Sequence, residues 1–204
     1  MRRWDAPINN GVGSWDGLGL IQFWDDYIQL GRDVWNAFAT EVFRKRMGLE
    51  LPAIMLEMSL CEFDRSNPVV FSGRLERETK ASKEYESFIG KEVVRVGIDT
   101  SKKNSNRPIN FNVTRELKFS VGHALIDYDG TVCQKKDGKF KIDLNLKMHD
   151  RYDFDLWIGR LFEGDLKHFG LGVGNNLAWL DQKVGIILPY LWEVSFDEHR
   201  TWPW

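Results

Sequence analysis

The sequence contains few cysteines, few prolines and no excess of basic residues. Two of its 204 residues are cysteine and six are proline, and 28 lysines and arginines stand against 30 aspartates and glutamates, a net charge of -2. Two cysteines are too few for a disulfide framework, and they lack the spacing of metal ligands. Nucleic-acid-binding proteins usually carry more basic than acidic residues, and this sequence gives no such support for binding a nucleic acid. We expect Cys61 and Cys133 to be buried free thiols, and a bridge between them stays open as the alternative.

A long hydrophobic run is also missing. The longest apolar stretch, Val184–Trp192, is interrupted by Pro189, whereas a membrane-spanning helix needs about 20 apolar residues. The basic start Met1-Arg2-Arg3 is followed by Trp4-Asp5-Ala6-Pro7 in place of the apolar run of an export signal. We therefore expect neither a transmembrane segment nor a signal peptide.

Aromatic residues, in contrast, are abundant. The chain has nine tryptophans and thirteen phenylalanines, within a hydrophobic content of 43% that is ordinary for a globular protein. Most of these rings are expected in a core, because aromatic side chains bury large areas. A groove for a lipid, or a contact with a membrane interface, is the alternative. Trp202 and Trp204, near the end of the sequence, favour the surface.

Periodicity predicts an α+β fold with two regions, a helical one over 1–104 and a β-rich one over 105–204. Apolar residues recur at three and four positions in the first region, which is typical of amphipathic helices. The expected helices cover 18–47, 53–61 and 74–94. Residues 101–108 carry no apolar side chain and predict a loop at the boundary.

The second region alternates apolar and polar residues, the pattern of half-buried strands. Asp129-Gly130 and Asp137-Gly138 are hairpin turn signals. We predict an antiparallel, half-barrel-like sheet, then a short helix over 155–166 and a glycine-rich loop over 170–176. The expected strands cover 113–128, 131–136, 139–148 and 190–196.

The densest group of chemically capable side chains follows the strand that ends near residue 148. It is His149-Asp150-Arg151-Tyr152-Asp153-Phe154-Asp155. In an extended chain Asp150 and Tyr152 share one face, and Arg151 and Asp153 share the other. Carboxylates at the end of a sheet suit a divalent cation or acid–base chemistry on a phosphate ester. Aspartates also gather at strand ends because they accept backbone N–H groups, and a tyrosine there commonly packs its ring.

This group resembles a known catalytic signature. Asp150-x-Tyr152-Asp153, five residues and then Gly159-Arg160 is similar to the D-x-Y-D-x5-H-R motif of the colicin M family. Members of that family are bacterial toxins that need magnesium and cleave the lipid-linked peptidoglycan precursor, lipid II. Position 159 departs from the pattern, because glycine stands where the family has histidine.

The resemblance implies a role for each matching residue. It makes 105–204 a catalytic region, with Asp150 and Asp153 as ligands of Mg²⁺ or activators of water. Tyr152 and Arg160 would contact the pyrophosphate. Arg151, Asp155 and His168 are assigned to substrate binding. As replacement for the missing histidine we expect His199 first and His168 second, or no histidine at all, with Asp155 taking the proton.

These residues predict an antibacterial effector that hydrolyses lipid II in the periplasm of a target bacterium. Because no export signal is recognised, a secretion apparatus or a larger toxin would deliver it, and a cognate immunity protein would be its partner. The alternative is a non-enzymatic α+β binding module, such as an immunity or adaptor protein, with exposed tryptophans as anchors. A nuclease is disfavoured by the acidic balance.

Overall fold

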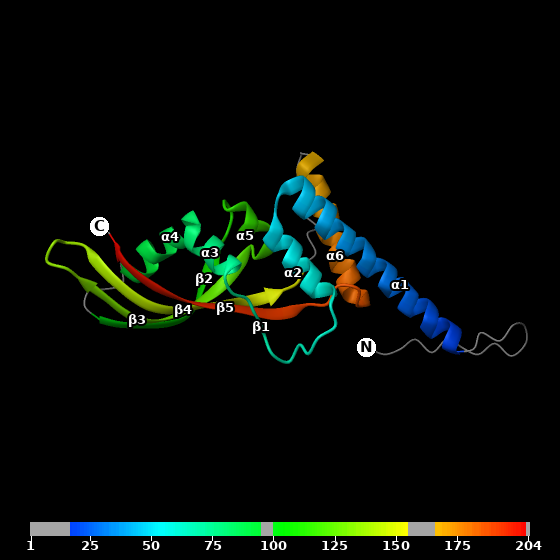
Figure 1. The fold of residues 1–204 in the computed structure, drawn as a ribbon, viewed down its shortest axis with the longest axis horizontal. Coiled ribbons are helices and arrows are strands. Elements are labelled where there is room, and N and C mark those ends of the chain that lie inside the picture. The colour runs from blue at the N-terminus through cyan, green and yellow to red at the C-terminus, as the bar shows by residue number, and fades with distance from the viewer. Residues whose placement is uncertain (1–16, 95–99, 155–165, 203–204) are drawn as a thin grey trace, which may run out of the picture.

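The computed structural model describes residues 17–94, 100–154 and 166–202 of the chain, and the fold is α+β (Figure 1). Helices dominate the first half and a sheet the second, as predicted. In chain order the elements are α1 (Gly17–Phe38), the π-helical η1 (Ala39–Met47), α2 (Glu50–Leu60), β1 (Val69–Val70), α3 (Arg74–Ala81), α4 (Lys83–Phe88), η2 (Ile89–Val94), β2 (Thr100–Asn110), α5 (Arg115–Ser120), β3 (His123–Gln134), β4 (Phe140–Tyr152), α6 (Leu166–Val184) and β5 (Tyr190–Trp202).

The sheet has five strands in the order β1-β5-β4-β3-β2. The four long strands pair antiparallel, but the two residues of β1 run parallel to β5, so the sheet is mixed. It is open, since β1 and β2 form its two edges. The predicted antiparallel arrangement therefore holds for β2 to β5.

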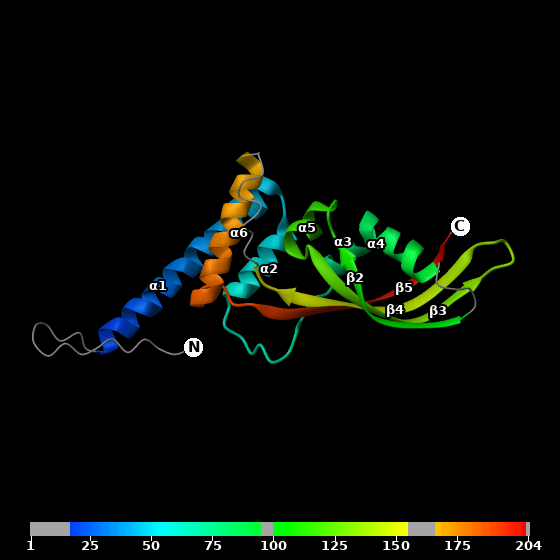
Figure 2. The same ribbon diagram turned by 180° about the vertical axis from the view of Figure 1, so that it is seen from behind.

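One face of the sheet is covered and the other is not. Helices α2 to α5 lie on the same side of the strands in both views (Figures 1 and 2). Alternate residues of β4 from Phe140 to Met148 are buried against them, and the residues between are half-buried or exposed. This alternation is the reason the strand could be predicted, because successive side chains point to opposite faces.

A second core holds α1, α2 and α6 together at one end of the sheet (Figure 2). The indole Nε1 of Trp35 donates to Asp181 Oδ2 at 2.7 Å. Gly31 allows close approach, since a Cβ there would lie 2.6 Å from the side chain of Ile186. Among the described helices, none combines the length and the apolarity needed to cross a membrane.

Three local predictions are wrong. Residues 101–108 belong to strand β2, residues 170–176 lie inside helix α6, and Asp129-Gly130 continues strand β3 without a turn. In each case tertiary pairing or packing overrides a local signal for a loop. Asp137-Gly138 does form the turn between β3 and β4, where Lys135 N donates to Lys139 O at 2.7 Å.

Two further expectations need correction. Residues 115–120, predicted within a strand, form helix α5, and the two residues before it, Val113 and Thr114, donate their backbone N–H groups to the carboxylate of Glu84. Cys61 and Cys133 are free, as expected, but both are exposed and not buried. Most of the helix predicted over 155–166 lies outside the described residues.

Candidate functional site

The predicted catalytic group begins at the last residues of β4. Asp150 pairs with Trp192 of β5 in the ladder and keeps 29% of its side chain exposed. Its Oδ1 accepts the backbone N–H of Arg151 at 2.8 Å. Its Oδ2 lies 3.3 Å from Nδ1 of His123, the first residue of β3. The end of β4 thus holds a half-exposed imidazole against a carboxylate.

Tyr152 has a different environment. Its side chain is buried, its ring stacks on Tyr190 with centroids 5.3 Å apart, and Phe154 contacts it edge-on. Burial raises the pKa of its hydroxyl far above the ordinary value. This is the packing role that the sequence left open as the alternative for Tyr152.

Arg151 and Asp153 pair with each other just beyond the strand. Arg151 Nε lies 3.3 Å from Asp153 Oδ2, and the arginine side chain is 60% exposed. Phe154 follows and is anchored between the two cores, with its backbone N–H donating to Gln182 Oε1 at 2.9 Å. Arg151 and Asp153 therefore lie at the surface, and the contacts of Phe154 hold the chain in place directly after them.

The carboxylates at this end have the chemistry of magnesium ligands. Mg²⁺ binds through one or two carboxylates and keeps several waters, and Asp150 and Asp153 are carboxylates that keep about a third of their side chains exposed. Within the described residues, no three histidine, cysteine, aspartate or glutamate side chains form a group that could hold a metal ion. Magnesium binding stays a prediction for Asp150 and Asp153.

The remaining predicted site residues are dispersed or not described. His199 pairs with Asp143, its Nδ1 lying 3.1 Å from Oδ1. Asp143 is seven positions before Asp150 on β4, about 23 Å at the usual rise of a strand. His199 is thus not brought to Asp150. Asp155 and Arg160 lie outside the described residues, and His168 is in helix α6 but its side chain is not described.

His123 falls inside the strand expected over 113–128, and sequence reasoning assigned it no role in the site. It stands 27 residues before Asp150, and only the antiparallel register of β3 and β4 joins them. A histidine at the first position of a strand gave no local signal of this contact. The other histidine near the motif, His149, instead faces Asp127, with Nε2 and Oδ2 3.3 Å apart.

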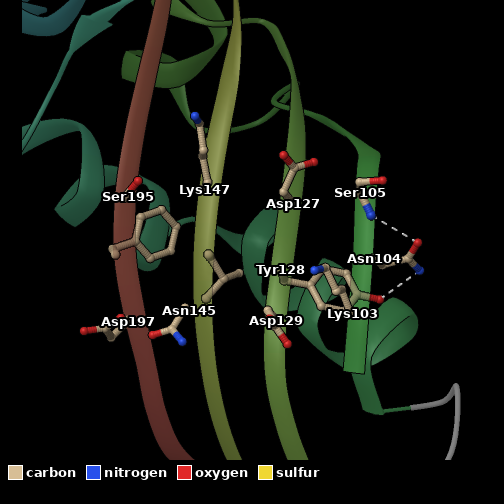
Figure 3. A pocket seen from close by; sticks show the side chains of 12 residues that line it. Lys103, Asn104, Ser105, Asp127, Tyr128, Asp129, Asn145, Lys147, Ser195 and Asp197 are labelled. Atoms are coloured by element: carbon tan, nitrogen blue, oxygen red, sulfur yellow. Dashed lines mark hydrogen bonds between the residues drawn. The ribbon is translucent and has the colours of Figure 1, made fainter. Parts of the chain in front are cut away.

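The uncovered face of the sheet carries an open groove of about 640 Å³ (Figure 3). Three consecutive residues from each of β2, β3, β4 and β5 line it. They are Lys103, Asn104, Ser105, Asp127, Tyr128, Asp129, Asn145, Leu146, Lys147, Ser195, Phe196 and Asp197. This groove was not predicted, since its residues come from four separate segments.

Comparisons with known proteins find little similarity. No protein family matches the sequence, and no curated protein matches it. Among solved structures, the chain is similar to PaeM, a colicin M-like bacteriocin produced by Pseudomonas aeruginosa, with 17% sequence identity and a TM-score of 0.38. The similarity covers 74% of this chain and 50% of PaeM, so the chain spans about half the length of that protein. At this identity and TM-score, the similarity assigns neither a substrate nor a cofactor to this chain.

Proposed function

We propose that this chain is a toxin-like hydrolase that cleaves the lipid-linked peptidoglycan precursor, lipid II, between the undecaprenyl chain and the pyrophosphate. It would act in the periplasm of a target bacterium, and a cognate immunity protein would protect the producing cell. The D-x-Y-D-x5-G-R pattern of residues 150–160 supports this reaction class.

The contact between Asp150 and His123 carries the proposal. An imidazole held by a carboxylate is the arrangement that general-base catalysis uses, because the carboxylate orients the ring and stabilises its protonated form. The 3.3 Å separation of Nδ1 and Oδ2 leaves Nε2 as the ring nitrogen for a substrate water. His123 thereby supplies the imidazole that position 159 lacks.

The chain's own residues would then share the reaction. His123 accepts a proton from water as the water oxygen attacks phosphorus. The phosphoester bond breaks, and the leaving undecaprenyl oxygen takes a proton from solvent to give undecaprenol. Arg151, 60% exposed beside Asp153, would contact the charged pyrophosphate. Arg160 keeps its predicted role of stabilising charge there. Magnesium, held by Asp150 and Asp153, would supply further neutralisation of that charge when bound.

Incubation of the purified chain with radiolabelled lipid II, with Mg²⁺ or with EDTA, tests the proposal by separation of undecaprenol. Asp150→Asn keeps the shape of the side chain and removes its charge, so we expect it to lower the rate by about 10³-fold. Asp143→Asn, a matched change on the same strand, should leave the rate within about threefold. Undecaprenol release that is equal in the Asp150 variant would refute the proposed site.

An exposed apolar stripe on α1 favours a second candidate, a protein-binding module. Trp24, Tyr27, Leu30 and Val34 are spaced by three or four residues and are all exposed. Such a stripe is typical of a helix that packs on a partner. If the chain releases no undecaprenol but sediments with a partner protein, and Leu30→Glu abolishes that complex, this function replaces the first.

A further inference from the structure

Polar side chains on the uncovered face of the sheet are paired with one another at both ends of the four long strands. Toward the Asp150 end, Lys147 Nζ lies 2.5 Å from Glu193, and His149 contacts Asp127. Toward the β3–β4 hairpin, Asp143 binds both Lys141 and His199. The charges in these two zones are satisfied within the protein.

The row between these zones is not paired. The register places Lys103, Asp129, Asn145 and Asp197 opposite one another on adjacent strands. Within the described residues, none of these four side chains has a hydrogen-bond or ion-pair partner in the protein. The row spans three strand spacings, about 14 Å. Four side chains that could bond to a ligand therefore stand in line across the sheet.

This row forms one wall of the groove (Figure 3). The opposite wall holds Ser105, Asp127, Lys147 and Ser195, and the residues between the walls are Asn104, Tyr128, Leu146 and Phe196. The rings of Tyr128 and Phe196 contact Phe88 and Tyr85 of the helical layer, so strand main chain forms the floor. The groove runs across the strands and is polar along both walls.

The chemistry of the groove excludes several ligands. The unpaired row contains two carboxylates and one lysine, and this excess of negative charge disfavours the phosphate backbone of a nucleic acid. The floor consists of paired strands, so it offers no free N–H or C=O groups for an added peptide strand. Asp129 and Asp197 lie two strand spacings apart, about 10 Å, which is too far for them to share one metal ion. A ligand must be held by side chains alone.

We propose that this groove binds a glycan chain. The hydroxyl groups of a sugar both donate and accept hydrogen bonds. They therefore suit this row, in which the carboxylates accept hydrogen bonds, the lysine donates them and the Asn145 amide does both. A neutral sugar also needs no compensating charge. The identification of this glycan as the sugar portion of lipid II rests on the proposed function. Asn145 shares the uncovered face of β4 with Arg151, the proposed contact of the pyrophosphate, which lies six positions further along the strand, about 20 Å.

Titration of the ¹⁵N-labelled chain with chitotetraose, a neutral chain of N-acetylated sugars, tests the site by NMR. We expect shifts in the amides of residues 127–129, 145–147 and 195–197. The double variant Asp129→Asn/Asp197→Asn should weaken binding by at least about tenfold, because two charge-assisted hydrogen bonds are lost. Asp143→Asn, on the same face but outside the groove, should change it by less than about twofold.

Other outcomes would overturn the proposal. Shifts confined to other residues, or no shifts, would remove the groove as a glycan site, and so would equal binding by the double variant. Tetralysine that binds the groove in place of chitotetraose would make it a cationic-peptide site. If the chain binds chitotetraose but does not hydrolyse lipid II, the glycan site stands and the proposed enzyme activity is refuted. If it hydrolyses lipid II but does not bind chitotetraose, the enzyme activity stands and the glycan site is refuted.

Discussion

The two faces of the sheet use polar residues in opposite ways. On the covered face, the buried carboxylate of Glu198 accepts from the Tyr85 hydroxyl at 2.9 Å and lies 3.2 Å from Arg200 Nε. On the uncovered face, carboxylates such as Asp129 and Asp197 have no partner within the described residues. The strands are the same, so the helices above one face make the difference.

This contrast separates stability from binding. A buried carboxylate must be hydrogen-bonded, since leaving its partners unsatisfied costs free energy. An exposed one is solvated and contributes little, whether or not it is paired. Unpaired polar residues on the uncovered face are therefore free to meet a ligand, and buried ones on the covered face are committed to the fold.

The largest expected effect concerns two histidine–aspartate pairs at opposite ends of the sheet. His123→Gln should lower lipid II hydrolysis by about 10²-fold or more, because it removes the proposed base. His199→Gln removes the residue that the sequence ranked first, yet it should change the rate by less than about threefold, since its partner is Asp143. Rates of undecaprenol release measure both. The reverse order would assign the imidazole role to His199.

The next largest effect is expected when one glutamate on each face of the sheet is replaced by alanine. Glu198→Ala leaves the Tyr85 hydroxyl and the half-buried Arg200 without this partner, and we expect a loss of about 3 kcal/mol in the free energy of unfolding. Glu193→Ala removes the pair with Lys147 on the uncovered face and should cost less than about 1 kcal/mol. Urea denaturation followed by circular dichroism measures both losses. Equal losses would contradict the distinction between the faces.

A glycine in β3 gives a smaller effect. Gly130 has φ +150°, and a Cβ there would lie 2.1 Å from the carbonyl oxygen of Asp143 on the neighbouring strand. Gly130→Ala should therefore cost about 2 kcal/mol of unfolding free energy. Gly138 has φ +80° with nothing near its Cβ position, and Gly138→Ala should cost about 1 kcal/mol from backbone strain alone. Thermal unfolding would show the larger shift for Gly130, and a larger shift for Gly138 would contradict the close contact.

Gly130 also illustrates which features of the fold local sequence could predict. The alternation of residues 139–148 and the turn at Asp137-Gly138 depend on neighbouring residues, and both are confirmed. Asp129-Gly130 carries the same turn signal but continues a strand, because its conformation is set by pairing with β4. Residues 101–108 form β2 for a similar reason, since pairing with β3 makes a strand of a polar segment.

The candidate site follows the same rule. Asp150, Arg151 and Asp153 could be proposed from the sequence because they lie in one contiguous motif. His123 and the groove could not, because they depend on the register of strands that are distant in the chain. The side-chain contact of His123 with Asp150 and the row from Lys103 to Asp197 become visible only when the strands are aligned.

The smallest expected effect depends on pH and concerns the helical layer over the covered face. Burial raises the pKa of Glu84, but hydrogen bonds from Thr114 and Val113 outweigh it, and the net pKa lies below the ordinary value of 4.5. A carboxyl group whose pKa is lowered by folding stabilises the fold above its unfolded pKa. That contribution is lost as the pH falls through the folded pKa.

Glu84→Gln should therefore destabilise the chain at pH 7 by about 1 kcal/mol, because the charged carboxylate accepts the N–H groups of Val113 and Thr114 and the Thr114 hydroxyl. The difference from the unsubstituted chain should shrink between about pH 5 and pH 3. Glu62→Gln removes an exposed partner of Arg32 and should change stability by less than about 0.5 kcal/mol at either pH. Urea denaturation at several pH values measures this gap. If the difference in unfolding free energy stays constant with pH, Glu84 acts through its shape and through neutral hydrogen bonds. The negative charge of its carboxylate would then contribute no stability to the helical layer that covers the sheet.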